Sequence, residues 1–169
     1  IRFKLVHMLK SPATSALIIL ALLSCMCSCK SIHKTDFEKE KEEILALDEK
    51  AREFHFTKNA KAMAESFSNE FISLNKGVIS KPTYDDHFNR FDRYFKSVEF
   101  LKWDNVTPPV VRFSDDASVA YVAVDKLVIL KLKDDSGKEV LDTTKFAWLS
   151  VFKKIKKKWV LDCIASTNK

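Results

Sequence analysis

The stretch that decides the fold is residues 117–166, which read ASVAYVAVDKLVILKLKDDSGKEVLDTTKFAWLSVFKKIKKKWVLDCIAS. It contains three long runs of β-branched and aromatic residues, separated by polar breaks around Ser136-Gly137 and Lys153–Lys158. Such runs joined by short polar turns are typical of consecutive antiparallel strands. The runs are much longer than an ordinary strand of about 5–6 residues. We therefore predict a strongly curved antiparallel sheet whose concave side is filled by helices.

The helices that could fill it lie upstream. Three- and four-residue steps between apolar residues predict a first helix over residues 36–56 and a shorter one over residues 59–66. A third is expected to begin near Pro82, because Thr83 and Asp86 have the spacing of a capping box. The inward-facing residues predicted for the first helix are Phe37, Ile44, Leu47, Ala51 and Phe54, and those predicted for the third are Tyr84, Phe88, Phe91 and Phe95.

Shorter strands are predicted between and after these helices. Residues 70–74 and 78–79 read as a small hairpin across Asn75-Lys76-Gly77. Residues 98–103 and 110–113 read as one strand that is interrupted at Thr107-Pro108-Pro109, since proline cannot donate to a strand ladder. In the long strand that follows, period-two alternation places Ala120, Val122, Val124 and Val128 on the face that packs on the helices.

This order of elements resembles the nuclear transport factor 2-like superfamily, particularly its SnoaL-like members. The resemblance covers about residues 36–168 and rests on the acidic turn and strand start DDASVAYV at 115–122, on Phe146–Phe152, and on Lys158-Trp159 with Ser166. One departure is Lys156-Lys157, where relatives often have Asp-Gly or Asn-Gly. The resemblance implies an α+β, cystatin-like cone with a pocket open at one end. Relatives use that pocket as isomerases, cyclases, dehydratases or binding modules, so the fold does not fix the function.

The N-terminal residues have a different character. Basic residues, the apolar run Ala16–Leu23 and a small residue before Cys25 predict a secretory signal over residues 1–24, and Leu22–Cys25 resembles a bacterial lipobox. We expect translation to begin at Met8, Cys25 to be lipidated, residues 25–35 to form a tether, and residues 36–169 to form the domain. Cys29 is a second candidate for the lipid. An uncleaved anchor and a cleaved, secreted protein are the alternatives to a lipoprotein held in the bacterial cell envelope, at the outer membrane or facing the periplasm.

Charge and cysteine content exclude several classes of function. The first 24 residues hold three basic and no acidic residues, so the rest of the chain has 26 basic and 23 acidic residues and a net charge of +3. That small excess in an exported protein argues against a nucleic-acid partner. Cys163 is the only cysteine of the expected domain, and no Cys/His pair has zinc-ligand spacing, so we expect no metal and no cofactor.

Acid–base chemistry has few candidates in this sequence. Asp162 follows an apolar run, and burial would raise the pKa of such a carboxyl, although a salt bridge to a lysine of a neighbouring strand is the alternative. His55 or Tyr84 could complete a pair with it, and His87 is a further possible base. The carboxylate and tyrosine set of steroid-isomerase-like relatives has no match here, because the first helix offers Phe54, His55 and Phe56.

An aromatic interior without an acid–base set favours a non-catalytic, membrane-tethered pocket domain that binds a small apolar ligand or a protein partner. We expect six residues to line the pocket: Phe54, Phe91, Trp103, Tyr121, Trp148 and Ser150. The alternative function is an isomerase or dehydratase that uses a buried carboxylate with histidine or tyrosine. A structural envelope protein that forms a homodimer through an exposed apolar sheet face is a third possibility.

Overall fold

The computed structural model describes residues 35–168, which belong to a compact unit that begins at Thr35. The expected signal peptide and the lipidation candidates Cys25 and Cys29 lie outside the described residues. Within residues 35–168, no helix is both long and apolar enough to cross a membrane.

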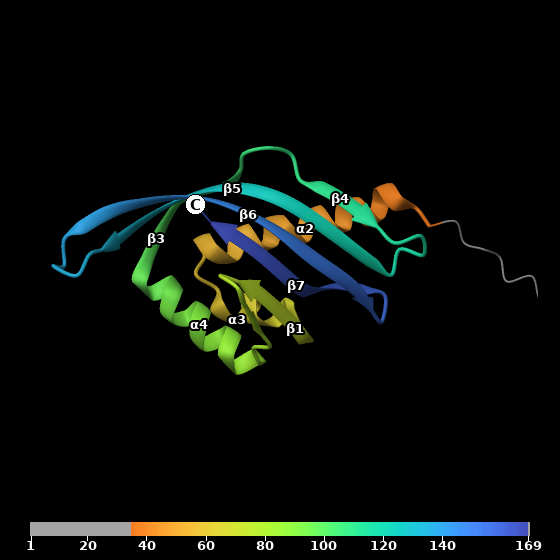
Figure 1. The fold of residues 1–169 in the computed structure, drawn as a ribbon, viewed down its shortest axis with the longest axis horizontal. Coiled ribbons are helices and arrows are strands. Elements are labelled where there is room, and N and C mark those ends of the chain that lie inside the picture. The colour runs from red at the N-terminus through yellow and green to blue at the C-terminus, as the bar shows by residue number, and fades with distance from the viewer. Residues whose placement is uncertain (1–34, 169) are drawn as a thin grey trace, which may run out of the picture. The chain divides into compact units, whose positions relative to one another are not determined.

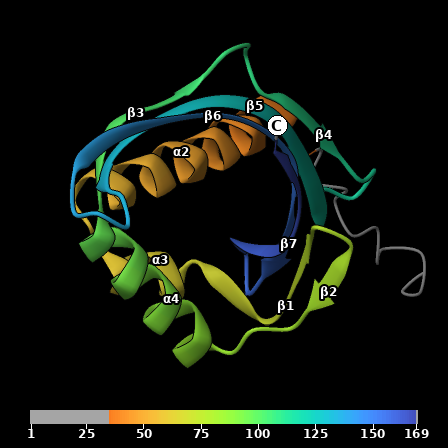
Figure 2. The same cartoon turned by 60° about the vertical axis from the view of Figure 1, so that its left-hand side comes forward.

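Three helices lie on the concave side of a curved sheet (Figures 1 and 2). Helix α2 spans Phe37–Phe56, and the side chain of Asp36 caps it by accepting a hydrogen bond from the Lys39 amide. Helix α3 spans Ala60–Glu65, and helix α4 spans Tyr84–Ser97. The predicted capping box is present at the start of α4, where the Thr83 hydroxyl accepts from the Asp86 amide and the Asp86 carboxylate accepts from the Thr83 amide.

The seven-stranded sheet has the order β2-β1-β7-β6-β5-β3, and β4 also pairs with β5. Hairpin strands β1 (Phe67–Asn75) and β2 (Val78–Ser80) form one edge, and β3 (Val98–Asn105) and β4 (Val110–Phe113) lie one after the other along β5. The long strands are β5 (Val119–Lys133), β6 (Glu139–Ile155) and β7 (Lys158–Asn168). The α+β fold with a curved sheet around N-terminal helices is confirmed.

One part of the predicted topology is wrong, because the sheet is mixed and not wholly antiparallel. Strands β1 and β7 are parallel, with Ile72 opposite Cys163 and Asn75 opposite Ser166. Strands that are joined by a short turn must pair antiparallel. Strands β1 and β7 are separated in sequence by most of the domain, so no turn fixes their relative direction. Residue alternation shows which face a side chain occupies and says nothing of the direction of a distant neighbour.

The inner face of β5 has the predicted composition. Ala120, Val122, Val124 and Val128 are buried, and the helices cover them together with the inner residues of the neighbouring strands. Asp125 points to the other face, where it accepts hydrogen bonds from the amide and the hydroxyl of Thr107 at the proline break between β3 and β4. Lys126 also belongs to the inner face, and its place is described with the site below.

The predicted aromatic stripe of α4 is correct for only half of its members. Phe91 and Phe95 are buried, whereas Tyr84 and Phe88 are exposed and stack on each other with ring centroids 6.4 Å apart. Tyr84 lies in the first turn of the helix, at the end that points away from β3 (Figure 1). The buried face instead begins with His87, four residues before Phe91.

The β6–β7 turn keeps a tight hairpin geometry without glycine. Lys156 and Lys157 have φ angles of 50° and 66°, and Ile155 pairs with Lys158 across the two-residue turn. Positive φ at both central residues is the requirement of a type I′ turn, which asparagine and glycine satisfy with less strain. The departure from the family pattern therefore changes the residues of the turn and leaves the hairpin in place.

Candidate functional site

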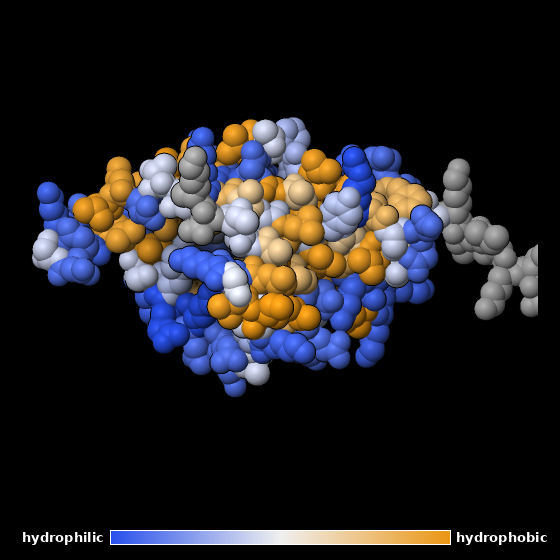
Figure 3. Space-filling model, viewed as in Figure 1, coloured by the Kyte–Doolittle hydropathy of each residue, from blue (hydrophilic) through white to orange (hydrophobic). Residues whose placement is uncertain are grey.

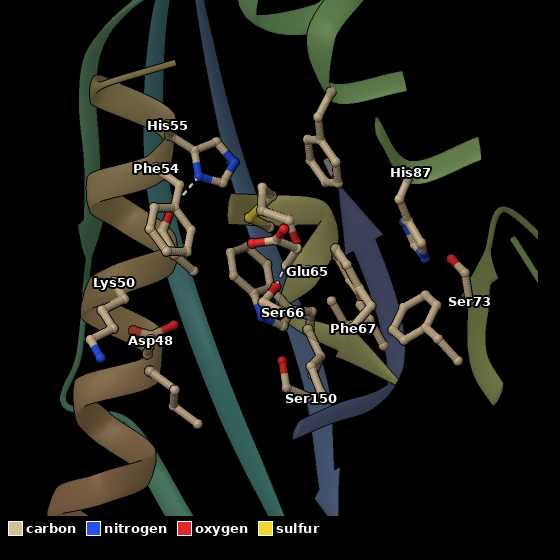
Figure 4. A pocket seen from close by; sticks show the side chains of 18 of the residues that line it. Asp48, Lys50, Phe54, His55, Glu65, Ser66, Phe67, Ser73, His87 and Ser150 are labelled. Carbon is tan, nitrogen blue, oxygen red and sulfur yellow. Dashed lines mark hydrogen bonds between the residues drawn. The ribbon is translucent and has the colours of Figure 1, made fainter. Parts of the chain in front are cut away.

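A cavity of about 850 Å³ lies between the helices and the concave face of the sheet. Helix α2 forms one wall, helices α3 and α4 with strand β1 form the opposite wall, and strands β6 and β7 lie between the two (Figure 4). This volume is in the range of sites that hold drug-sized ligands, which is about 300–1,000 Å³. All three tryptophans of the chain, Trp103, Trp148 and Trp159, line the cavity.

Five of the six residues expected in the pocket lie in its lining. Phe54 contributes from α2, Phe91 from α4, Trp103 from β3, and Trp148 and Ser150 from β6. Two of these rings, those of Trp103 and Trp148, have centroids 6.1 Å apart. Trp148 and Ser150 are two residues apart on one strand, so both side chains point to the concave face.

The sixth residue, Tyr121, is on the opposite face of the sheet. Its side chain is 44% exposed, because it alternates with the buried residues Ala120 and Val122 along β5. Tyr84 is likewise outside the large cavity. It is 46% exposed and borders only a smaller hollow of about 240 Å³ beside the start of α4. These two predicted positions are wrong for the same reason: aromatic character was not enough to show which way each side chain faces.

Asp162 is also outside the cavity, and the structure shows the alternative expected for it, a salt bridge to a lysine of a neighbouring strand. One of its carboxylate oxygens lies 2.8 Å from the Lys153 ammonium and accepts a hydrogen bond of 2.6 Å from the Ser68 hydroxyl. The register between β6 and β7 shifts at this point, so that Val151 is opposite Cys163 while Phe152 is opposite Leu161. Asp162 is the extra residue of this bulge, and the simple alternation along the strand fails there.

His55 lies in the cavity wall and is buried among aromatic rings. Its imidazole stacks on Trp103 with centroids 3.9 Å apart, and Phe95 and Phe100 meet it edge-on. Its Nδ1 donates to the Ala51 carbonyl at 2.6 Å, because a carbonyl can only accept. Burial, opposed by that hydrogen bond, lowers the pKa of His55 to about 4. The ring is therefore neutral near pH 7, and its Nε2 is an acceptor directed into the cavity (Figure 4).

His87 is the second histidine of the lining, and it is only 2% exposed. Its ring is nearly parallel to that of Phe67, with centroids 3.9 Å apart, and it meets the edge of Phe71. Neither ring nitrogen has a hydrogen-bond partner within residues 35–168. Burial lowers the pKa of His87 to about 4, with a smaller contribution from the nearby positive charge of Arg90.

A buried ion pair that the sequence analysis did not identify lies beside the cavity. The Lys126 ammonium is 2.9 Å from a carboxylate oxygen of Asp48 and 5.7 Å from the centre of the Trp148 ring. Lys126 is 2% exposed, whereas Asp48 is 19% exposed and contributes to the lining. The sequence contained a signal for both residues, because Lys126 alternates with Val124 and Val128, and Asp48 follows Ile44 by one helical turn.

A second unpredicted cluster joins the beginning of α2 to the β6–β7 hairpin. Glu40 accepts a hydrogen bond of 2.7 Å from the Trp159 indole, and it also pairs with Lys154. The Lys154 ammonium lies 4.9 Å from the centre of the Trp159 ring. Burial acts to raise the pKa of Glu40, but the hydrogen bonds from Lys154 and Trp159 outweigh it and hold that pKa below its usual value. This cluster fixes the position of Trp159 in the cavity wall.

Other charged residues of the lining lie at its rim. Lys50, Glu65 and Arg90 are exposed, and Glu65 is 3.9 Å from Lys61 on the surface of α3. Within residues 35–168, no group of three or more histidine, cysteine, aspartate or glutamate side chains is arranged to hold a metal ion. The cavity thus combines an aromatic interior, a few neutral polar groups and a charged rim.

Asp48 and His55 both line the cavity from α2, but at separate positions along the helix. The carboxylate nearest to the interior, Asp48, is already neutralised by Lys126. It is also seven residues from His55 on the same helix, which places the two backbones about 10 Å apart along the helix axis. A general acid and base must each reach the reacting part of a substrate, and Asp48 and His55 are hydrogen-bonded to other groups, Lys126 and the Ala51 carbonyl, and not to each other.

Comparison with known proteins gives the fold. Neither a protein-family profile nor a curated protein matches the sequence. Among solved structures, an NTF2-like protein from Cytophaga hutchinsonii has a TM-score of 0.60 at 11% identity, covering 76% of this chain and 98% of that one. An NTF2-like protein with a cystatin-like fold from Novosphingobium aromaticivorans has a TM-score of 0.56 at 13% identity, covering 90% of this chain and 87% of that one.

A third similar structure is the association domain of CaMKII from C. elegans, with a TM-score of 0.53 at 14% identity over 77% of this chain and 96% of that one. At sequence identities this low, the likeness shows that the fold is shared and says nothing of whether the activity is shared. The element order, the curved mixed sheet and these likenesses agree, and residues 35–168 have the cystatin-like fold of NTF2-like proteins.

Proposed function

We propose that this domain binds a small, predominantly apolar molecule in the cavity between helices and sheet, without transforming it. The observation that carries the proposal is the cavity itself: about 850 Å³, walled by aromatic side chains from both helices and strands. Domains of this size ordinarily fill their interiors to the density of an organic crystal. An aromatic-walled space of this volume therefore costs stability in the free protein, and occupancy by a ligand recovers the lost contacts.

The contrast between interior and rim supports binding over catalysis. The two histidines of the lining are neutral, and the interior carboxylate has a lysine partner. An isomerase or dehydratase needs an acid and a base that reach adjacent atoms of the substrate. The candidates from the sequence do not meet in the cavity, since Asp162 and Tyr84 both lie outside it.

The test is to fill the cavity and compare ligand retention. Ala51 lines the cavity on α2, whereas Ala46 is exposed on the same helix. Wild type, Ala51→Trp and Ala46→Trp are incubated with a metabolite extract, repurified and analysed by native mass spectrometry. We expect a bound small molecule on wild type and on Ala46→Trp, and its loss from Ala51→Trp. Equal retention by all three, or none on wild type, would count against the proposal.

We further propose that the domain is held at the bacterial cell envelope by a lipid on Cys25. The support is the sequence before the domain: a basic segment, an apolar run and Leu22-Leu23-Ser24-Cys25. Growth with an alkyne analogue of palmitate should label the wild-type protein and Cys29→Ser but not Cys25→Ser. Labelling of Cys25→Ser would show that the lipid is not on Cys25 and would overturn this proposal.

The outer face of the sheet supports a homodimer as an additional proposal. A row of apolar residues crosses five strands in register, and Figure 3 shows hydrophobic side chains gathered in the middle of the face viewed there. The row consists of Val110, Ala123, Leu149, Ala165 and Leu74. We expect a dimer by light scattering, and we expect Leu149→Glu to shift it to monomer. A monomeric wild type at high concentration would refute this proposal.

A further inference from the structure

The turn between β6 and β7 presents three lysines that have no acidic partner in the domain. These lysines, at residues 156–158 (the turn lysines), are exposed and form no salt bridge within residues 35–168. The two lysines before them differ, because Lys153 pairs with Asp162 and Lys154 pairs with Glu40. The strand ends of this hairpin are therefore balanced in charge, and its tip is positive.

Two of the turn lysines stand where other residues would be less strained. Lys156 and Lys157 have φ angles of 50° and 66°, the left-handed values that a type I′ turn requires. Asparagine and glycine adopt these values more easily than lysine does. Strained positions of this kind are concentrated at functional sites. The choice of lysine in place of the easier residues thus points to a use for its charge.

The turn between β4 and β5 brings opposing charge close to the hairpin. The Lys154 amide donates to the Ser118 carbonyl of this turn. The turn also contains Asp115 and Asp116, and the Asp116 carboxylate accepts hydrogen bonds from the hydroxyls of Ser114 and Ser118. Neither aspartate forms a salt bridge within residues 35–168. Three turn lysines outnumber two aspartates, so the surface formed by the two turns keeps a positive excess.

The chain enters the domain at this same end. The Glu40 side chain, near the start of α2, accepts a hydrogen bond from the indole of Trp159, the residue that follows the turn lysines. The proposed lipid site, Cys25, precedes Thr35 by ten residues. Ten residues of chain span at most about 35 Å. A lipid on Cys25 therefore keeps Thr35, and with it the hairpin, near the bilayer.

Residues beside the turn have the character of a membrane interface. Ile155 precedes the turn lysines and is exposed, and Phe37 in the first turn of α2 is also exposed. Lysines with apolar neighbours suit the boundary between headgroups and water, where the ammonium meets phosphate and the apolar group meets the acyl chains. Residues 26–34 add Lys30 and Lys34 and contain no acidic residue, as is typical of a segment beside an anionic membrane.

We propose that the β6–β7 hairpin faces the membrane, with the turn lysines bound to the phosphate groups of anionic phospholipids in the bilayer that carries the lipid of Cys25. This inference rests on the proposed lipid anchor and adds an orientation to it. The lipid limits the distance of the domain from the bilayer, and the lysines select which end of the domain turns toward it. Each lysine close to an anionic surface favours the bound state by roughly fivefold, so three of them are enough to hold one orientation.

The test measures which lysines the bilayer shields. Lipidated protein purified from cells is placed in vesicles of phosphatidylcholine, or of phosphatidylcholine and phosphatidylglycerol in a two-to-one mixture. A neutral acetylating reagent is added at low salt, and mass spectrometry gives the rate of acetylation at each lysine. Lys133 and Lys138 are internal controls, because both are exposed at the β5–β6 turn, at the opposite end of β6 (Figure 1).

On the wild type, we expect phosphatidylglycerol to slow acetylation of the turn lysines by at least roughly tenfold, and high salt to remove this shielding. Lys133 and Lys138 should react equally in both kinds of vesicle. The double variant Lys156→Gln/Lys157→Gln keeps one turn lysine, so the shielding of Lys158 should fall to roughly fivefold or less. The matched variant Lys133→Gln/Lys138→Gln removes the same charge at the other end of β6 and should keep the full shielding of Lys158.

Equal acetylation of the turn lysines in both kinds of vesicle, or equal shielding of Lys133 and Lys138, would overturn the inference and leave the lipid anchor standing. Full shielding of Lys158 in Lys156→Gln/Lys157→Gln would also overturn it. A single-stranded oligonucleotide that shields the turn lysines better than the anionic vesicles do would assign the hairpin to a nucleic-acid partner instead. If the purified protein carries no lipid, the anchor proposal fails, and acetylation with added anionic vesicles then decides on the turn lysines separately.

Discussion

Removing one member of the Asp48–Lys126 pair should have very unequal effects, depending on which member is removed. The Lys126 ammonium is 2% exposed and lies 2.9 Å from Asp48. At an effective dielectric constant of about 20, charges at that distance attract each other by about 6 kcal/mol, and this attraction offsets the loss of hydration. Asp48→Leu leaves the buried ammonium without a partner, and we expect it to lower the free energy of unfolding by about 3–5 kcal/mol.

Lys126→Met leaves the Asp48 carboxylate without a partner, but this carboxylate is less deeply buried than the Lys126 ammonium. Asp48 borders the cavity and is 19% exposed, so water in the cavity can hydrate its carboxylate. The methionine side chain also keeps the apolar contact with Trp148. We expect this variant to lose no more than about 2 kcal/mol. The double variant should recover most of the loss of Asp48→Leu, since replacing a whole buried pair by apolar side chains is often nearly neutral.

The assay is urea unfolding followed by circular dichroism, with the four proteins of the double-mutant cycle measured at neutral pH. A loss of 3–5 kcal/mol is a large part of the about 5–15 kcal/mol of a typical domain, so the midpoint should shift clearly while the slope stays constant. Glu139→Leu is the control, because its pair with Lys131 is exposed and should matter little. If Asp48→Leu and Lys126→Met were equally destabilising, or if the double variant were no better than Asp48→Leu, the argument from unequal burial would be refuted.

Three further predictions concern pH and the β6–β7 turn. Because the pKa values of His55 and His87 fall from 6.5 to about 4 on folding, the unfolded chain binds more protons between these values, and stability should decrease as the pH falls through that window. The two histidine-to-phenylalanine variants should flatten this dependence in urea titrations, and an unchanged slope would contradict it. The pKa of Glu40 is lowered on folding, so its stabilising effect is complete at neutral pH and is lost as the pH falls below 4.5. Glu40→Ala should therefore destabilise the protein at neutral pH and have little effect in acid, and equal losses at both would be the opposing result. Lys157→Gly should raise stability by about 1 kcal/mol by relieving the positive φ of 66°, as measured by the urea midpoint, and a lower midpoint would exclude a strained turn.

The sequence was sufficient for the parts of the fold that depend on local pattern. The alternation through Val122 and Val124 identified the buried face of β5, and Thr83 with Asp86 marked the start of α4. Trp148 and Ser150 followed from the same alternation on β6. In each case a period of two or a cap motif is a direct consequence of backbone geometry, so no knowledge of distant residues is required.

The errors have a common physical origin in pairing between distant segments. Asp162 lies outside the cavity because a bulge in the pairing of β7 with β6 interrupts the alternation of side chains there. No residue in this stretch marks the bulge in the sequence. His87 was considered only as a lone base, and its position among Phe67, Phe71 and Phe91 depends on how α4 packs on β1. Alternation along β5 places Lys126 on the inner face. A lysine is rarely buried without a charged partner, however, and the sequence did not show that Asp48 lies beside it.

The parallel pairing of β1 with β7 has a consequence for how the domain matures. Strand β7 contributes Val160, Leu161, Ile164 and Ser166 to the cavity, and it is the last of the described strands to leave the ribosome. Until it is inserted between β1 and β6, the aromatic side chains of the earlier segments have no complete enclosure. A nascent chain without this strand should therefore remain open and protease-sensitive. The cavity wall is then complete only when β7 has paired with both of its neighbours.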